Sequence, residues 1–588
     1  MPHASTWHSR LAPWLSGLVI VAALAALYFR FILRPEEFFI GDLVSYYQPM
    51  RQYVSGCLGE GKLPMWTTAL FAGTPQIADA QLAIFYPPTW LHLWVSFPLS
   101  ELILLLGHLF LGGIGVLFLA RRLGLGRASA LFAALGYSLS GFFVSHLVHP
   151  NFVHSAAWIP WLLGLLHGVV AGPQGAARRA SEVALAAAAT AGCLLAGGVQ
   201  IAYLGLGMAA VMALVWVIAT PDLDHRSRLL RGAAAVGALS LGVGLAAVQL
   251  LPTAELAPLS IRAEGVTLEL ARSYRLAARQ GLGLVVPFPF GLAERTPVVW
   301  SQPFHESFGY FGVSALPLAL TALFGFGIFG SQGQPLGVRA WRLGLPRLVL
   351  GAIALCGLFA AMGPEAPVDV HRWLFELLPG FDRFRAPGRL LFLVLTPTIL
   401  LAAFGLQDLL GGDENLRARA RRLHLGFSLL MVGVACSVGL LASGAGGPMP
   451  EATAELARRS ALGSACVVLA VVALVRGGAR WRVARAWVGA GVVAIHLLDL
   501  VTVGRAVVAA RQLPDGVDPG RLAHRPPPEA EADPGRAHHD HRVLYQPDSC
   551  FMLQNAGLLH GYDNLRTYSP GWLRRTYDLS HLADQGRF

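Results

Sequence analysis

The chain has 588 residues, of which 55% are hydrophobic and 13% are charged. Its net charge is +11. Soluble domains carry about 25% charged residues, so a soluble chain of this length would lack the polar side chains that its surface needs. The composition therefore excludes a soluble enzyme, a disordered protein and a small disulfide scaffold, and it predicts a polytopic membrane protein.

Thirteen apolar runs are long enough, or nearly so, to cross a bilayer, which takes about 20 residues in a helix. The first run, 11–33, lacks the short core and small-residue cleavage site of a signal peptide, so we expect it to remain as an anchor. The predicted fold is an all-α bundle of roughly 13 spans. The later runs lie near 99–120, 128–147, 152–171, 182–197, 199–220, 233–251, 309–330, 346–362, 389–411, 425–443, 461–476 and 486–504.

Arginines gather in every second short loop between these runs. Basic residues are retained in cytoplasmic loops, so this alternation predicts a cytoplasmic N-terminus and explains the net charge without a nucleic-acid partner. The arginine clusters are Arg121, Arg122 and Arg127; Arg178 and Arg179; Arg226, Arg228 and Arg231; Arg339, Arg342 and Arg347; Arg417, Arg419, Arg421 and Arg422; and Arg476, Arg480, Arg482 and Arg485.

The same topology divides the chain into three parts. Residues 1–504 are expected to form the transmembrane domain, with long extracytoplasmic loops at 34–98 and 252–308. A flexible linker is predicted at 505–541, because it holds the stretch RPPPEAEADPG, and a short extracytoplasmic C-terminal segment at 542–588.

The first long loop opens with Asp42, directly before a stretch in which apolar residues recur at helical spacing. The apolar residues Val44, Tyr47, Met50, Tyr53 and Val54 predict an amphipathic helix along the membrane surface. Two interpretations of Asp42 remain open. It could cap that helix, which Asp does well, or it could act as a general base at the membrane edge.

Three blocks of this loop together resemble a known family: G-D-x3-Y-x-Q-P from Gly41, G-K-L-P-x-W from Gly61, and G-x-P-x3-A-x2-Q-x3-FYP from Gly73. This pattern is similar to the YfhO-like family of bacterial membrane proteins, which is itself similar to the GT-C glycosyltransferases. AGGVQ at 196–200, HESFGYFG at 305–312 and LPGFDRFRAPGR at 378–389 agree with it. The resemblance spans roughly residues 10 to 500 and implies a protein of the bacterial plasma membrane.

The resemblance implies transfer of a sugar from a polyprenyl-phosphate donor at the extracytoplasmic face. An acidic residue in the first outer loop is the hallmark of such enzymes, and Asp42 matches it, as the base or as an acid that binds metal. Because the leaving group is already a phosphate, one base can suffice, and direct displacement implies inversion. A divalent metal is compatible with this reading, but the sequence supplies no decisive ligand set.

Arg385 and Arg389 are the candidates for holding the donor phosphate, since guanidinium groups offer a planar fork of donors. They could equally be interfacial arginines that snorkel, and Arg383 is a weaker candidate. Glu306 could be a second carboxylate near the donor, a metal ligand or a charge that favours a helix start. The other candidates for contact with substrate are Tyr46, Gln48, Asp79, Gln81, Gln200 and His305.

His149, Asn151 and His154 lie in the short stretch HPNFVH. The spacing of the two histidines could bind a metal, but we favour the interpretation that these are polar residues at the membrane interface. Two rival functions stay open: a flippase or transporter of lipid-linked saccharides, which would place charges at mid-span, and a noncatalytic partner in envelope-polymer assembly. The expected partners are a lipid-linked sugar, membrane lipid and an unidentified envelope acceptor.

Overall fold

The computed structural model describes residues 4–510 with short gaps, together with 542–543 and 563–564. The gaps are 39–40, 69, 71–72, 173–174, 222, 261–262, 293–302, 326–337, 413, 446–448 and 482. Most of the predicted linker and of the predicted C-terminal segment lies outside the described residues.

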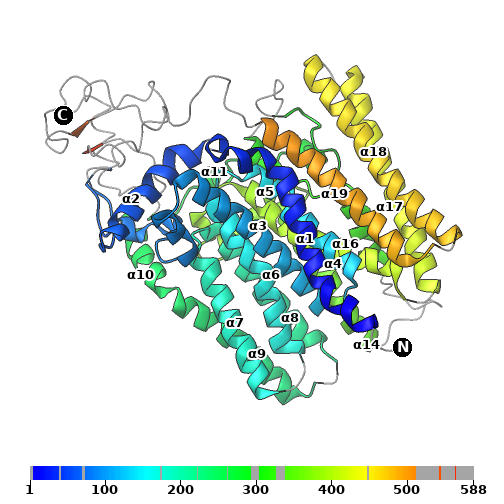
Figure 1. The fold of residues 1–588 in the computed structure, drawn as a ribbon, viewed down its shortest axis with the longest axis horizontal. Coiled ribbons are helices and arrows are strands. Elements are labelled where there is room, and N and C mark those ends of the chain that lie inside the picture. The colour runs from blue at the N-terminus through cyan, green and yellow to red at the C-terminus, as the bar shows by residue number, and fades with distance from the viewer. Residues whose placement is uncertain are drawn as a thin grey trace.

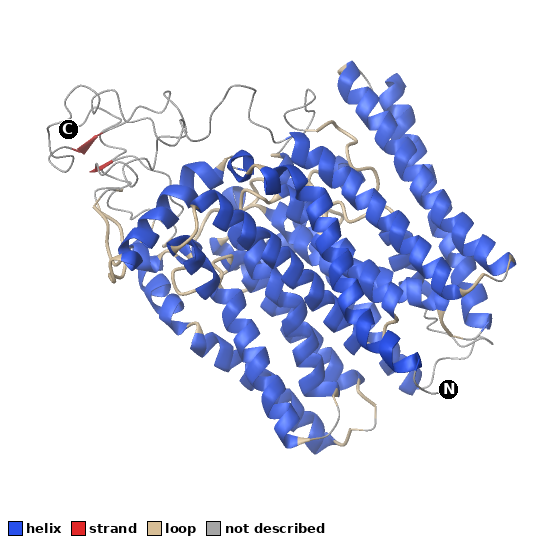
Figure 2. Ribbon diagram, viewed as in Figure 1, coloured by secondary structure: helices blue, strands red, loops and turns tan. Residues whose placement is uncertain are grey.

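Nearly all described elements are helices, and the long ones lie side by side in one bundle (Figures 1 and 2). The long helices are α1 (Ala4–Leu33), α3 (Phe97–Arg122), α4 (Arg127–Ser138), α6 (Pro150–Ala171), α7 (Ala176–Leu195), α8 (Val199–Ala219), α9 (His225–Leu245), α14 (Val338–Met362), α16 (Leu391–Leu410), α17 (Glu414–Leu440), α18 (Glu451–Arg480) and α19 (Arg485–Ala510). Shorter α-helices are α2 (Gln48–Gly59), α5 (Gly141–Ser145), α10 (Ala247–Leu256), α11 (Leu268–Ala271), α12 (Phe304–Ser307), α13 (Ala315–Gly325) and α15 (Val370–Leu377).

Short turns and one strand pair complete the fold. The 3₁₀ turns are Pro35–Phe38, Gln76–Ala78, Ala80–Leu82, Pro87–Leu93, Ala257–Leu259, Ala278–Leu284, Gly363–Glu365, Phe381–Arg383 and Pro387–Leu390, and π turns are Leu43–Tyr47 and Leu441–Ala445. β1 (Arg542–Val543) pairs in parallel with β2 (Asp563–Asn564).

Within the described residues, 11 helical segments are long and apolar enough to cross a membrane. The prediction of an all-α, multi-pass membrane protein is therefore confirmed, whereas the count of thirteen is not. The predicted span 182–197 coincides with α7, whose early turns carry Arg178, Arg179 and Glu182. The predicted span 309–330 coincides with α13, which has 11 residues.

Burial separates an inner group of helices from an outer one. The α4–α5 segment, α6 and α16 are largely enclosed by other helices, whereas α9, α14 and α17 keep most of their surface exposed. The exposed surfaces are apolar, with Leu229, Leu241, Leu429 and Leu430 all more than half exposed. Such surfaces suit contact with lipid rather than water.

Members of three predicted arginine clusters lie at one end of the bundle. At that end Arg122 of α3 lies 2.8 Å from Glu182 of α7, and Arg347 of α14 lies 2.6 Å from Asp408 of α16. Arg231 of α9 donates a hydrogen bond to the carbonyl of Val170 at the end of α6. The first loop and the start of α6 lie at the opposite end of these helices.

The start of the first loop forms two helical pieces instead of the single predicted helix. A π turn covers Leu43–Tyr47, and α2 begins at Gln48 with Pro49 in its first turn. The predicted apolar face is nevertheless buried, including Val44, Met50 and Val54. The π turn adds a residue to the helical repeat, which a pattern of 3.6 residues per turn does not predict.

A buried ion pair fastens α2 to the start of α3. Arg51 is 1% exposed and its guanidinium pairs with Glu101, which is fully buried. His92 lies 3.3 Å from the same carboxylate. Removing one partner of a buried pair leaves an uncompensated charge, whereas replacing both with apolar groups removes that penalty.

We expect Arg51→Leu and Glu101→Leu each to destabilise the protein by about 3–5 kcal/mol. The double variant should lose much less than the sum, because neither charge then remains buried. Thermal unfolding in detergent measures this cycle, with Glu60→Gln in the exposed Glu60–Lys62 pair as control. Additive losses would show that the two side chains do not interact.

Candidate functional site

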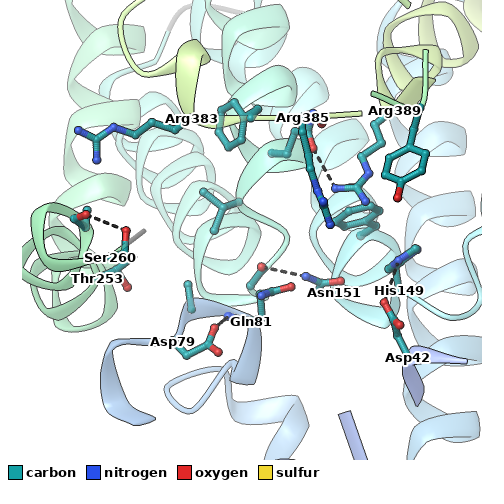
Figure 3. A pocket seen from close by; sticks show the side chains of 18 of the residues that line it. Asp42, Asp79, Gln81, His149, Asn151, Thr253, Ser260, Arg383, Arg385 and Arg389 are labelled. Atoms are coloured by element: carbon teal, nitrogen blue, oxygen red, sulfur yellow. Dashed lines mark hydrogen bonds and ion pairs between the residues drawn. The ribbon is translucent and has the colours of Figure 1, made fainter. Parts of the chain in front are cut away.

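A cavity of about 560 Å³ lies at the end of the bundle opposite the paired arginines Arg122 and Arg347. Figure 3 shows this cavity from close by. Its walls come from the first loop, the starts of α6 and α8, the end of α10, α12 and the segment 383–389. Its polar lining residues are Asp42, Asp79, Gln81, His149, Asn151, Gln200, Thr253, Ser260, Tyr274, His305, Glu306, Arg383, Arg385 and Arg389. Carboxylates and guanidinium groups from segments far apart in the chain thus line one cavity.

Asp42 enters this cavity from a tight turn. Gly41 has φ +55°, a left-handed conformation that glycine adopts without strain, and it directs the chain from α1 into the π turn. Asp42 precedes the π turn but makes no side-chain capping bond to it. Its Oδ2 lies 3.4 Å from Nε2 of His149, so the capping interpretation is wrong and the carboxylate is directed at the cavity.

Arg389 and Glu306 form the most tightly bonded pair of the lining. Arg389 donates to both oxygens of Glu306, with Nη2 2.6 Å from Oε1 and Nε 3.0 Å from Oε2. Nη1 of Arg389 also donates to Oε1 of Gln200 at 3.2 Å. Burial opposes ionisation of Glu306, but Arg389 and His146 outweigh it and hold its pKa well below the usual range. Glu306 is therefore a carboxylate at neutral pH.

Arg385 differs from Arg389 because its charge is not matched by a carboxylate. Its backbone carbonyl accepts a hydrogen bond from Gln200, and its guanidinium lies 5.7 Å from the ring of Tyr274. Within the ranges that the structure describes, no ion pair of this guanidinium occurs. Arg383 is exposed at the far end of the cavity (Figure 3).

The segment that carries these arginines lies close to the segment that carries Glu306. The amide of Gly388 donates to the carbonyl of Tyr274 at 3.2 Å, and a Cβ at Gly388 would lie only 1.9 Å from the carbonyl oxygen of Glu306. Tyr274 and Ala386 both have positive φ, +60° and +63°. Such backbone strain in residues other than glycine is characteristic of sites where geometry is imposed for function.

Asp79 faces the cavity from the floor but is fully hydrogen-bonded. Its two oxygens accept from the hydroxyl of Tyr46 and from the amide of Gln81, the latter at 3.0 Å. The pKa of Asp79 is raised, because removal from water outweighs these hydrogen bonds. Asp79 thus caps the 3₁₀ turn Ala80–Leu82 as well as lining the cavity.

The segment after α12 is anchored to α19 by an acid inside the membrane domain. Asp499 accepts hydrogen bonds from the Tyr310 hydroxyl at 2.7 Å and from the Val313 amide at 3.1 Å. This fixes the chain a few residues beyond Glu306. Its partners lie nearly 190 residues away in the chain.

The structure brings eight of the ten predicted site residues to the cavity wall: Asp42, Asp79, Gln81, Gln200, His305, Glu306, Arg385 and Arg389. Tyr46 is buried behind Asp79. Gln48 is absent from the lining residues.

Sequence reasoning missed His149 and Asn151, which were expected to be merely interfacial. Both line the cavity, where Asn151 accepts from Tyr47 at 2.7 Å and donates to the Gly197 carbonyl at 3.1 Å. The signal was available: Pro150 begins α6, which places its two polar neighbours at the mouth of a span. His154, one turn later, instead stacks on His108 inside the bundle.

In the part of the chain that the structure describes, no group of three or more His, Cys, Asp and Glu side chains is close enough to hold a metal ion. The donor set present therefore does not fit a metal site built from these residues alone.

The chain matches no protein-family model and no curated protein, so the YfhO-like resemblance is not confirmed. The structure of ArnT from Cupriavidus metallidurans bound to undecaprenyl phosphate aligns over 94% of this chain and 85% of its own, at 13% identity and TM-score 0.47. The apo oligosaccharyltransferase from Archaeoglobus fulgidus aligns over 97% and 66%, at 11% identity and TM-score 0.48. AglB from A. fulgidus with an inhibitory peptide and a dolichol-phosphate aligns over 96% and 65%, at 10% identity and TM-score 0.45. These values are too low to support an activity.

Glu306→Gln should destabilise the protein by about 3–5 kcal/mol at pH 7, because Arg389 then lacks its counter-charge. The folded-state pKa of Glu306 is depressed, so its stabilising contribution is complete above the unfolded value of about 4.3 and is lost as pH falls through the folded pKa. The difference in melting temperature between parent and variant should therefore shrink below about pH 4. A difference that is constant across this range would contradict the pairing.

Proposed function

We propose that this chain is a membrane glycosyltransferase that moves a sugar from a polyprenyl-phosphate donor to a hydroxyl acceptor at the extracytoplasmic face. The observation that carries the proposal is the convergence of the Asp42 carboxylate and the Arg385 guanidinium on one cavity. An anionic donor and a hydroxyl acceptor require one group of each kind.

The proposed reaction needs few groups. Asp42 takes the proton of the acceptor hydroxyl while the hydroxyl oxygen forms a bond to the anomeric carbon of the sugar. The bond between that carbon and the phosphate oxygen breaks, its electron pair stays on the polyprenyl phosphate, and the anomeric configuration inverts. Arg385 stabilises the phosphate charge, which rises in this step.

Charge balance supports Arg385 rather than Arg389 as the principal phosphate ligand. Arg389 already donates to both oxygens of Glu306, so an incoming phosphate would compete with a buried ion pair. Arg385 brings an unmatched charge to the cavity wall, with Gln200 holding its backbone. We propose that Gln81, Gln200 and His305 contact the sugar or the phosphate from the same wall surfaces.

The sidedness of the cavity supports an extracytoplasmic reaction in a bacterial plasma membrane. The cavity lies at the end opposite the clustered arginines, and clustered arginines mark the cytoplasmic ends of spans. The exposed apolar helix surfaces supply the environment for a polyprenyl tail.

Asp42→Asn should lower sugar transfer by about 10²–10⁴-fold, the usual contribution of a general base. Membranes containing equal amounts of each protein are supplied with radiolabelled polyprenyl-phosphate sugars, and labelled acceptor is counted. Glu60→Gln is the matched control, because Glu60 is an exposed carboxylate of the same loop. Equal transfer by parent and Asp42→Asn would reject the assigned base.

Arg385→Gln should raise the donor KM by about 10-fold or more, since a charge-assisted hydrogen bond contributes roughly 1.5–3 kcal/mol. Arg372→Gln, on an exposed helix outside the cavity, should leave the KM unchanged. The donor KM of each variant is measured from steady-state transfer at varied donor concentration. An unchanged KM for Arg385→Gln would assign the phosphate to another group.

The rival transporter predicts a different result in the same membranes. An intact lipid-linked saccharide would cross the bilayer in both parent and Asp42→Asn, with no sugar transferred. Protease-free vesicles with donor labelled on one leaflet distinguish movement of the intact lipid from transfer of its sugar.

A further inference from the structure

His149 is the one charged or polar group that the structure sets against Asp42 among the described residues. Nε2 of His149 lies 3.4 Å from Oδ2 of Asp42, and the two side chains face each other in the cavity (Figure 3). No other hydrogen bond or ion pair of the Asp42 side chain occurs in the described ranges, and its side chain is 28% exposed. A carboxylate at such a position can turn between rotamers unless another group restrains it.

The imidazole of His149 is itself well restrained. The residue immediately precedes α6, with Pro150 in the first helical turn, and its side chain is only 11% exposed. Its ring stacks on that of Phe152, with centroids 5.0 Å apart and an interplanar angle of 23°. Because the Phe152 ring covers one face of the imidazole, the Nε2 edge of His149 is directed toward Asp42. The Nε2 edge of a closely packed ring thus lies against a carboxylate that has no capping bond of its own.

We propose that His149 is the positioning residue for Asp42, an inference that rests on the proposed transferase function. The Nε2–H donates to Oδ2 and leaves Oδ1 directed at the acceptor hydroxyl. In the transfer step the acceptor proton arrives on Oδ1, and it passes afterwards to water at the open cavity, while His149 keeps its own proton.

The other charged groups around His149 are engaged elsewhere. His146 and His305 lie with ring centroids 5.6 Å and 5.4 Å from that of His149. Both face Glu306 instead, at 3.7 Å and 3.9 Å, and Glu306 is paired with Arg389. The Asp42–His149 pair therefore stands beside a second pair whose charges balance.

Three variants at this position separate a positioning role from a merely structural one. His149→Ala removes the donor. His149→Gln keeps an amide N–H at about the reach of Nε2, and His149→Asn keeps one that is a carbon shorter. His225→Ala, an exposed histidine at the opposite end of the bundle, is the matched control.

We expect His149→Ala to lower kcat for sugar transfer about 10²-fold, with the donor KM changed less than threefold, because misplacing a catalytic group costs rate rather than binding. His149→Gln should recover about 10-fold of this loss, and His149→Asn should not.

Each of the other possible outcomes rejects a specific part of the proposal. If Asp42→Asn abolishes transfer and His149→Ala keeps the parental kcat, the positioning role is wrong and the transferase function stands. If Asp42→Asn stays fully active, the assigned base and its positioning residue fall together. If added Mn²⁺ or Mg²⁺ restores a chelator-treated parent but not His149→Ala, His149 binds a cation instead. Should His149→Ala not fold, the difference between His149→Gln and His149→Asn decides, and equal kcat values reject the proposal.

Discussion

The ion pair between Arg389 and Glu306 is the interaction on which the geometry of the cavity depends. It joins α12 to the turn that begins α16, and through Gln200 it reaches the start of α8. Both charges are largely removed from water, so each is tolerated only because the other is present. The close approach of Gly388 to the carbonyl of Glu306 makes this contact possible at the level of the backbone.

This pairing also sets the charge that remains for chemistry. With Arg389 and Glu306 neutralising each other, Arg383 and Arg385 are the lining guanidinium groups that have no ion pair among the described residues, and Asp42 lies against His149. The cavity therefore presents positive groups from the segment 383–385 and the Asp42 carboxylate from the first loop to whatever enters. That separation is what a reaction between an anionic leaving group and a hydroxyl nucleophile requires.

Acids inside the membrane domain hold the scaffold together. Glu101 pairs with Arg51, Glu182 with Arg122, and Asp408 with Arg347. Asp499 receives hydrogen bonds from Tyr310 and Val313. Charged residues in spans are functional suspects by default, but each of these is committed to a partner on another segment. They stabilise contacts between helices and loops that are distant in the sequence.

Much of the architecture could be predicted because its causes are local in sequence. A run of about 20 apolar residues must be a helix in lipid, since no other conformation satisfies its backbone there. The alternation of arginine-rich and arginine-poor loops and the mixed polar block after α1 could be recognised in the sequence for similar reasons. The π turn before α2 was not, because the apolar residues from Val44 to Val54 also fit the spacing of a single α-helix.

The candidate site also has one part that could be predicted from the sequence and one part that depends on tertiary packing. The sequence by itself determined that the chain spans the membrane many times, and it directed attention to Asp42, Arg385 and Arg389 through residue type and position in loops. Only the tertiary structure decided that Glu306 neutralises Arg389, that Gln48 is absent from the cavity lining, and that His149 stands against Asp42. Partner choice of this kind depends on which distant segments the packed helices bring within a few ångströms, and Coulomb and hydrogen-bond energies act only at that range.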